Sequence, residues 1–216
     1  MNLGYNSSMA LILAVAIVSM LLVLSEFGWR RGLLKGEFGR KFVHITVGTF
    51  VAFWPFFMSW NQIRLASLAF LVVVVITKYF HIFRAISSVQ RPTYGEVFFA
   101  LIVGAMTFVT HSKGVYAAAL LQMSLADGMA AVVGTYWGKD NKYQLLGHTK
   151  SIAGTATFLC LSFVILIGYS LLATKGLPIT MVVFGSLSAT ILENLAAFGL
   201  DNLIVPLFVG ILLTKL

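Results

Sequence analysis

The sequence has little charge and almost no cysteine. Only 10% of its 216 residues are charged, whereas an ordinary soluble domain carries roughly 25%. Cys160 is the only cysteine, which excludes a disulfide framework and a cysteine-based metal site within one chain. Hydrophobic residues make up 59% of the chain, and its mean hydropathy is +0.95. These values indicate an integral membrane protein.

The apolar segments predict the fold class. Segments such as Met9–Leu24 and Ile152–Ala173 are continuous rather than alternating, and they approach the roughly 20 residues that a membrane-spanning helix needs. Since lipid cannot satisfy backbone hydrogen bonds, we expect an all-α, polytopic helix bundle with seven or eight transmembrane helices. No repeat or linker divides it, so residues 1–216 are expected to form one domain. The expected spans lie near 9–25, 42–58, 63–80, 96–110, 115–137, 152–173, 179–198 and 203–216.

Basic residues predict the orientation. The first, third and fifth loops hold eleven lysines and arginines, and the second, fourth and sixth hold three. Because cytoplasmic loops are enriched in these residues, we expect the odd loops in the cytoplasm and the amino terminus outside, with the first apolar run retained as a span. The net charge of +8 then indicates contact with anionic membrane lipids rather than with nucleic acid. The eleven are Arg30, Arg31, Lys35, Arg40, Lys41, Lys78, Arg84, Arg91, Lys139, Lys142 and Lys150.

The fifth predicted span contains a carboxylate. Asp127 lies in an otherwise apolar helix, where a charge costs at least about 2.5–3.5 kcal/mol and normally faces a bundle interior or a wet cavity. Small residues recur every four positions along the same helix, and they indicate either close helix packing or a backbone that approaches a bulky ligand. They are Ala126, Ala130, Gly134 and Gly138.

The start of the sixth predicted span resembles an anion site. Lys150 and Ser151 stand at the amino terminus of that helix, with Gly154 and Thr155 in its first turn. Free N–H groups and a partial positive charge at a helix amino terminus favour phosphate. The segment is not a Walker A loop, because that spacing is absent. The alternative is that Lys150 is one more positive-inside residue and Ser151 a helix cap.

Two further polar groups flank these segments. Arg40, Lys41 and His44 share one face of a helical turn, which suits phosphate binding or snorkelling of the basic pair to the membrane surface. Glu193 and Asp201 share a face if the seventh helix is continuous, and Gly199 is a candidate bend. Carboxylate and amide oxygens suit Mg²⁺, whereas the alternative for each carboxylate is a salt bridge to a basic loop residue.

Together these motifs resemble the dolichol kinase, phytol kinase and farnesol kinase family, which is related to the phosphatidate cytidylyltransferases. The resemblance covers roughly Arg40 to the carboxyl terminus, and the order of the motifs is more specific than any one of them. The motifs are RKFVH at 40–44, ADGMAAVVGTYWGK at 126–139, GHTKSIAGT at 147–155, EN at 193–194 and DNLIVP at 201–206.

The resemblance implies a multi-span enzyme that phosphorylates an isoprenoid alcohol, or in some branches diacylglycerol, with CTP and a divalent metal such as Mg²⁺. It implies a metal or catalytic role for Asp127, and it leaves open whether Asp127 or Asp201 is the base. Lys150 and Ser151, with Gly154 and Thr155, would contact nucleotide phosphates. Glu193, Asp201 and Asn202 would complete the metal and phosphate environment. Arg40, Lys41 and His44 would hold a phosphate or the lipid headgroup.

Two other functions compete with a kinase. A cytidylyltransferase would carry a close pair of acidic residues soon after the Lys-Ser and glycine segment, but no acidic residue occurs between Asp140 and Glu193. An ion-coupled transporter would distribute polar residues through the membrane depth, whereas here they gather toward one face. We therefore expect a kinase active site at the cytoplasmic face.

Overall fold

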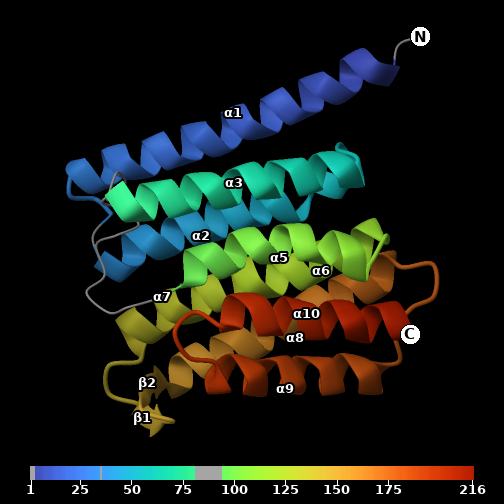
Figure 1. Ribbon diagram of the computed structural model, residues 1–216. Coiled ribbons are helices and arrows are strands. Elements are labelled where there is room, and N and C mark those ends of the chain that lie inside the picture. The colour runs from blue at the N-terminus through green and yellow to red at the C-terminus, as the bar shows by residue number, and fades with distance from the viewer. Residues whose placement is uncertain (1–2, 35, 81–93) are drawn as a thin grey trace.

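The computed structural model describes residues 3–34, 36–80 and 94–216, and over these residues the chain is a bundle of helices with one β-hairpin. Helices that follow one another in the chain run roughly antiparallel, except α6 and α7, which lie end to end (Figure 1). Lys35, Arg84 and Arg91, three of the basic residues behind the expected orientation, lie outside the described residues. The helices are α1 Leu3–Arg30, α2 Gly36–Ala52, α3 Trp60–Phe80, α5 Gly95–Val109, α6 Lys113–Leu121, α7 Asp127–Trp137, α8 Ile152–Leu172, α9 Ile179–Leu195 and α10 Asp201–Lys215.

Within the described residues, four helices are long and apolar enough to cross a membrane: Met9–Arg30, Trp60–Phe80, Lys113–Trp137 and Ile152–Leu172. Two shorter apolar helices, Gly95–Val109 and Ile179–Leu195, accompany them. The prediction of an apolar helix bundle is confirmed, and the lengths suit a multi-pass membrane protein. The long helices number fewer than the seven or eight spans expected from the sequence.

The helix Lys113–Trp137 is the most buried of the four long helices, and it forms the centre of the bundle. It comprises α6, a π-helical turn at Gln122–Ala126 and α7. Its small side chains, such as Ala118 and Ala119, are buried and let neighbouring helices approach closely. The Tyr116 hydroxyl donates to the Val103 carbonyl of α5 over 3.0 Å. This central helix therefore fixes the position of the elements around it.

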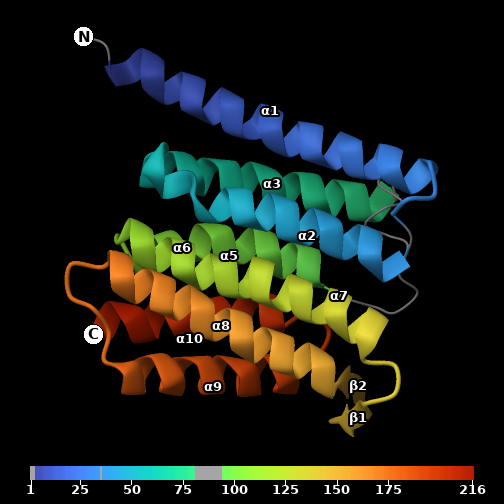
Figure 2. The same cartoon turned by 180° about the vertical axis from the view of Figure 1, so that it is seen from behind.

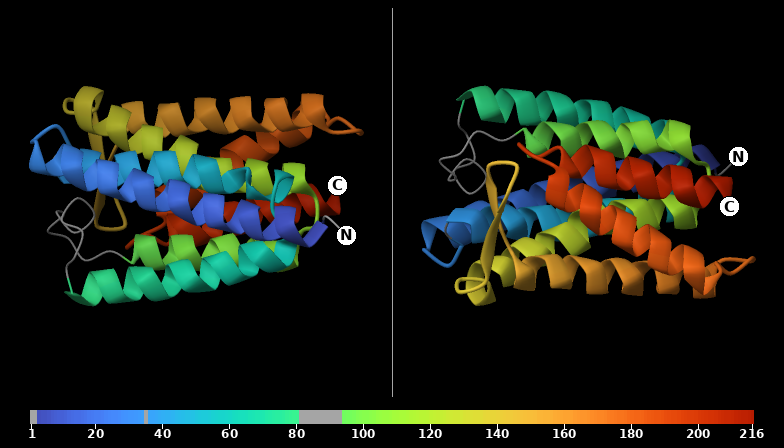
Figure 3. Two further views of the ribbon diagram at one scale, coloured as in Figure 1. Left: turned by 90° about the horizontal axis from the view of Figure 1, so that it is seen from above. Right: turned by 90° about the horizontal axis from the view of Figure 1, so that it is seen from below.

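The outer helices complete the bundle on both sides of the centre. Helix α1 packs on α2 and α3 at one edge, and α9 packs on α8 and α10 at the other (Figures 1 and 2). Both termini lie at one end of the bundle, and the β-hairpin crosses the opposite end (Figure 3). That end also holds the start of α2, the ends of α7 and α9 and the start of α10.

The segment between α7 and α8, expected from the sequence to be a loop, forms an antiparallel hairpin. Strand β1 is Lys142–Leu145, strand β2 is His148–Ser151, and Leu145 pairs with His148. The two linking residues, Leu146 and Gly147, have φ values of 47° and 79°. Two positive φ angles are typical of the tight type I′ turn, whose twist matches paired strands. Gly147 was the only local signal for it.

The seventh predicted span, near 179–198, corresponds to α9, but the helix does not continue to Asp201, which was the condition for Glu193 and Asp201 to share a face. The candidate bend at Gly199 is confirmed. Helix α9 ends at Leu195, and Asp201 begins α10. In the linker, Phe198 and Gly199 have φ values of 55° and 89°, which a right-handed helix cannot accommodate. The chain therefore turns sharply, and Asp201 approaches Glu193 from a different helix rather than from the next turns of the same one.

We predict that Gly48→Ala destabilises the protein and Gly168→Ala does not. A Cβ at Gly48 would lie 3.0 Å from the Phe99 ring and would clash with Ser124, whereas nothing lies within 4 Å of a Cβ at Gly168 in α8. Overpacking should lower the free energy of unfolding by about 1–3 kcal/mol at Gly48. Better helix propensity should raise it by up to about 1 kcal/mol at Gly168.

Thermal unfolding in detergent checks both glycine variants. Equal midpoints for Gly48→Ala and the wild-type protein would contradict the close contact of α2 with the central helix.

Candidate active site

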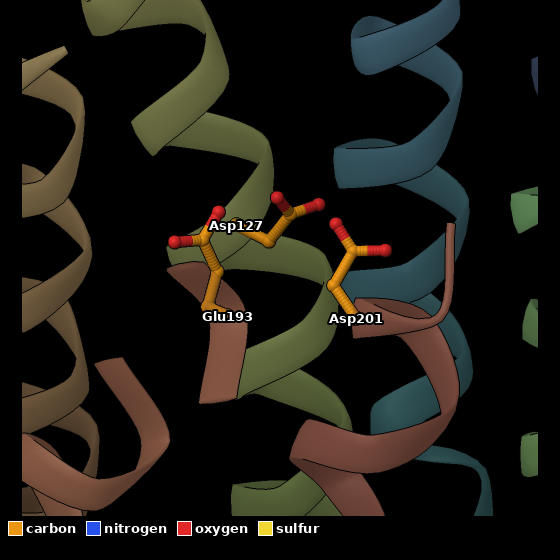
Figure 4. Close-up of side chains that lie close together, drawn as sticks. All are labelled: Asp127, Glu193 and Asp201. Atoms are coloured by element: carbon orange, nitrogen blue, oxygen red, sulfur yellow. The ribbon is translucent and has the colours of Figure 1, made fainter. Parts of the chain in front are cut away.

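Three carboxylates from separate segments meet at the hairpin end of the bundle. Asp127 opens α7, Glu193 lies near the end of α9 and Asp201 opens α10 (Figure 4). One oxygen from each lies within 4.8 Å of the others. Asp127 and Glu193 are each only 5% exposed. Such a buried concentration of negative charge needs compensation by cations.

Helix α2 supplies compensation for Asp127. The Lys41 Nζ lies 2.6 Å from the Asp127 Oδ2, and the His44 Nε2 lies 3.5 Å from the same oxygen. Lys41 is itself buried, so its ammonium does not snorkel to the membrane surface. Arg40, its neighbour, lines the adjacent cavity. One turn of α2 thus brings an ammonium and an imidazole to Asp127 and places Arg40 beside the adjacent cavity.

The π-helical turn sets the position of Asp127. The Asp127 N–H donates to the carbonyls of Gln122 and Ser124, not to that of Met123, its partner in a regular α-helix. The Met123 carbonyl lies 2.9 Å from the His44 Nε2, which must carry a proton to donate to it. A π-bulge in a helix frequently marks a functional site. Here the turn leaves the Met123 carbonyl, four residues before Asp127, to accept from His44.

The hairpin supplies compensation for Glu193. Lys150 forms an ion pair with the Glu193 carboxylate, and its Nζ donates to the Glu193 carbonyl over 3.1 Å. Burial is the largest single influence on Lys150 and acts to lower its pKa. The charge and hydrogen bond of Glu193, together with the charges of Asp127 and Asp201, outweigh burial and raise the pKa above its ordinary value. Lys150 therefore stays protonated at neutral pH. The salt-bridge alternative describes Glu193 correctly, and it places a cation beside the acidic cluster.

Asp201 differs from the other two carboxylates. It accepts a hydrogen bond of 3.0 Å from the Asn202 N–H, but no lysine or arginine of the described residues forms an ion pair with it. Asn202 is 3% exposed, and its Nδ2 donates to the Gly95 carbonyl over 2.8 Å. Its Oδ1 is buried without a hydrogen-bond partner among the described residues. A buried acceptor of this kind suits a water molecule or a cation.

A small hydrogen-bond network pins the hairpin to the bundle. The Tyr143 hydroxyl lies 2.5 Å from both the Thr155 Oγ1 and the Asn194 Oδ1, and Thr155 donates to the same Asn194 oxygen over 3.1 Å. Sequence reasoning did not assign Tyr143 or Asn194 to the site. Asn194 stood in a recognised motif, but the role of Tyr143 depends on the hairpin register, in which it pairs with Lys150.

Of the two alternatives raised by the spacing of the small residues, the structure shows close helix packing. A Cβ at Gly134 would lie 2.8 Å from the Ser151 Oγ, and one at Gly154 would lie 2.9 Å from the Ala130 carbonyl oxygen. Close packing of α7 and α8 therefore requires these glycines. Gly134 and Gly154 also line the cavity beside the carboxylates. Ser151 is a helix cap, since its Oγ accepts from the Gly154 N–H over 3.1 Å.

These elements enclose one cavity of about 460 Å³. All the site residues expected from the sequence line it except His44, which lies behind Asp127. Lys142, His148 and Phe198 line it as well, and sequence reasoning had not assigned a role in the site to any of them. The cavity thus combines three carboxylates, several cations and a helix amino terminus at one end of the bundle.

The oxygens of this cavity fit a hard divalent cation such as Mg²⁺. Carboxylates from three elements already converge, and the unpartnered Oδ1 of Asn202 lies next to Asp201 in the chain. Mg²⁺ is usually held by one or two carboxylates together with substrate phosphates. The lysines and the amino terminus of α8 suit those phosphates. The arrangement can therefore bind a metal and a polyphosphate side by side.

The chain is similar to a known protein over nearly its whole length. It is 31% identical over 220 residues to a phytol kinase from Synechocystis sp., and the match covers 96% of this chain and 94% of that protein. No family model matches the chain. No solved structure matches it either. The similarity therefore extends over both the bundle and the cavity.

We predict that Lys41→Met destabilises the protein and that a second change, Asp127→Asn, recovers much of the loss. Removing one partner of a buried ion pair leaves an uncompensated charge and costs about 3–5 kcal/mol. The double variant no longer buries a lone carboxylate. Thermal unfolding of the two variants measures the difference. Lys139→Met, on an exposed lysine, is the control and should leave the midpoint unchanged. Equal losses in the single and double variants would contradict the pairing.

Proposed function

The chain belongs to the phytol kinase family, and we propose that it transfers the terminal phosphate of CTP to an isoprenoid alcohol of the phytol, farnesol or polyprenol type, or to diacylglycerol. The observation that carries this proposal is the cluster of Asp127, Glu193 and Asp201 beside Lys41 and Lys150 in one cavity. Phosphoryl transfer requires positioning and charge neutralisation above all, and this cavity offers both.

Asp127, Glu193 and Asp201 would hold Mg²⁺, and the Oδ1 of Asn202 is a further candidate ligand. The ion would neutralise charge on the phosphates and help to position them.

The phosphates would occupy the cationic side of the cavity. Lys150 lies on β2, whereas Arg40 and Lys41 lie on α2, and all three line the cavity. Ser151, Gly154 and Thr155 form the amino terminus of α8, where the partial positive charge of the helix favours an anion. In the structure Lys41 and Lys150 neutralise Asp127 and Glu193. A polyphosphate that enters with its cation would share these lysines, so nucleotide and metal should bind together.

In the reaction, the hydroxyl oxygen of the lipid alcohol would attack the terminal phosphorus in line. The new O–P bond forms as the bond to CDP breaks, and CDP leaves. The hydroxyl proton needs an acceptor, for which the sequence left Asp127 and Asp201 open. We assign it to Asp201, because Lys41 occupies Asp127 whereas no described lysine or arginine pairs with Asp201. His44 would hold Asp127 in place from behind.

We further propose that residues 1–216 form one multi-pass membrane domain, with seven or eight spans, and that the hairpin end faces the cytoplasm. Support comes from the basic residues, since Arg30, Arg40, Lys142 and Lys150 lie at that end of the bundle. Arg64 and Lys113 lie at the other end, near the amino terminus. The amino terminus would then be outside the cytoplasm.

We predict that the purified protein transfers label from the γ-phosphate of CTP to phytol, farnesol, a polyprenol or diacylglycerol. Thin-layer chromatography of the extracted lipid measures the transfer, and removal of Mg²⁺ with a chelator should abolish it. A cytidylyltransferase would instead move the α-phosphate and its base onto phosphatidate. Lipid that carries only α-label would therefore refute the kinase.

We predict that Asp127→Asn, Asp201→Asn, Glu193→Gln and Lys150→Met each lower kcat/KM by at least about 100-fold. The three carboxylates would hold the metal that neutralises the transferring phosphate, Asp201 would also accept the hydroxyl proton, and Lys150 would neutralise the phosphate directly. The matched controls are Asp140→Asn and Lys139→Met, two exposed residues that do not line the cavity. Both should retain activity within about twofold, since surface substitutions are usually mild. Full activity of Asp127→Asn and Lys150→Met would refute the assigned site while leaving the kinase activity standing.

A further inference from the structure

The hairpin presents alternate residues to the bundle. Because side chains alternate along a strand and paired residues share a face, Tyr143, Leu145, His148 and Lys150 lie on one face of the hairpin. All four are partly buried, whereas Lys142, Gln144 and Thr149 on the other face are exposed and Ser151, the cap of α8, is buried. Lys150 reaches Glu193, as described above. His148, two residues away on the same face, has no part in the phosphotransfer steps already assigned.

His148 contacts an aromatic residue from another element. Its ring lies 5.4 Å from the Phe198 ring, centroid to centroid, at an interplanar angle of 89°. Both residues line the cavity that holds the carboxylates. Phe198 belongs to the linker between α9 and α10, and its carbonyl accepts from the Tyr94 N–H over 3.0 Å. The two rings thus form an aromatic border to a cavity that is otherwise charged or lined by small residues.

The conformation of Phe198 is costly for its residue type. Its φ of 55° lies in the left-handed region, which disfavours bulky side chains. The Phe198 side chain is also 56% exposed although it is large and apolar. Neither burial nor backbone preference therefore accounts for a phenylalanine at this position. A flat ligand in the cavity would cover the ring.

We propose that His148 and Phe198 form a subsite for the nucleobase of the phosphate donor. The inference rests on the proposed function, because it takes the charged side of the cavity to hold the phosphates. His148 lies roughly 7 Å along the strand from Lys150, at about 3.4 Å per residue. A ribose would bridge the distance between a phosphate beside Lys150 and a base beside His148.

The two rings suit different parts of a base. A phenylalanine ring offers a flat apolar surface for stacking, which every nucleobase can use. The imidazole nitrogens of His148 can donate or accept a hydrogen bond, so they can contact the polar edge of a base. The two rings are nearly perpendicular. A base stacked on the Phe198 ring would therefore turn the edge of the base toward His148.

The position of the hairpin argues against the lipid chain as the occupant. The hairpin crosses the end of the bundle, beyond the apolar helices α7 and α8 (Figure 3). Its other face carries exposed polar side chains at Lys142, Gln144 and Thr149, and Lys142 and Thr149 also line the cavity. A long prenyl chain needs apolar surroundings throughout. A nucleobase, flat on its faces and polar at its edge, fits an aromatic pair with a polar rim.

The test compares a ligand with a base and a ligand without one. Binding of CTP and of inorganic tripolyphosphate, each with Mg²⁺ in excess, is measured by titration calorimetry on the detergent-solubilised protein. We expect Phe198→Ala to weaken CTP binding about 10-fold and to leave tripolyphosphate binding unchanged. His148→Ala should act in the same direction. Phe198→Tyr, which keeps the ring, should restore CTP affinity.

The matched control is Phe53→Ala, an exposed phenylalanine at the other end of α2, which should change neither affinity. Equal weakening of CTP and tripolyphosphate binding by Phe198→Ala, or no weakening of either, would overturn the subsite.

The subsite and the proposed kinase activity are tested by different outcomes. If the wild-type protein phosphorylates an alcohol while Phe198→Ala keeps its CTP affinity, the kinase stands and the subsite falls. If CTP binds in the expected pattern but no alcohol is phosphorylated, the subsite stands and the kinase falls.

Discussion

Two buried lysine–carboxylate pairs hold the functional end of this bundle together. Lys41 with Asp127 joins α2 to α7, and Lys150 with Glu193 joins the hairpin to α9. In an apolar bundle each of these charges would be costly alone, so each pair requires its two elements to stay in register. The same four charges and Asp201 surround the cavity. Under the proposed function the same side chains would stabilise the bundle and carry the chemistry, so the salt bridge of Glu193 is compatible with its proposed role as a metal ligand.

Much of the fold follows from hydropathy, because a continuous apolar run in lipid has few alternatives to a helix. The expected span near 152–173 corresponds to α8, and the one near 63–80 to α3. The sequence also indicates in part that distant segments meet, because a carboxylate in an apolar helix needs a partner. Lys41 is that partner of Asp127. The sequence could not indicate which carboxylate each lysine contacts, because that depends on how the helices pack.

The features that hydropathy missed are local departures from regular structure. The hairpin depends on a two-residue turn, the break before Asp201 on positive φ at Phe198 and Gly199, and the placement of Asp127 on a π-helical turn. None of these three features changes the apolar pattern of the sequence. Each of them nevertheless places a polar side chain beside the cavity: Lys150, Asp201 and Asp127, respectively. The glycines of α7 and α8 permit the hairpin to approach, because a Cβ at Gly134 would meet Ser151. Irregular backbone is tolerated here because it lines a cavity instead of facing lipid.

The central claim is that Asp127, Glu193 and Asp201 hold a divalent metal beside a nucleotide whose phosphates reach Lys150. The most direct test is an experimental structure with Mn²⁺ in place of Mg²⁺ and a CTP analogue that cannot transfer its terminal phosphate. Anomalous scattering from Mn²⁺ locates the ion independently of the fitted nucleotide. The account predicts a peak among the three carboxylates, with phosphate density against Lys150 and the amino terminus of α8. A peak elsewhere in the bundle, with these carboxylates still paired only to lysines, would contradict it.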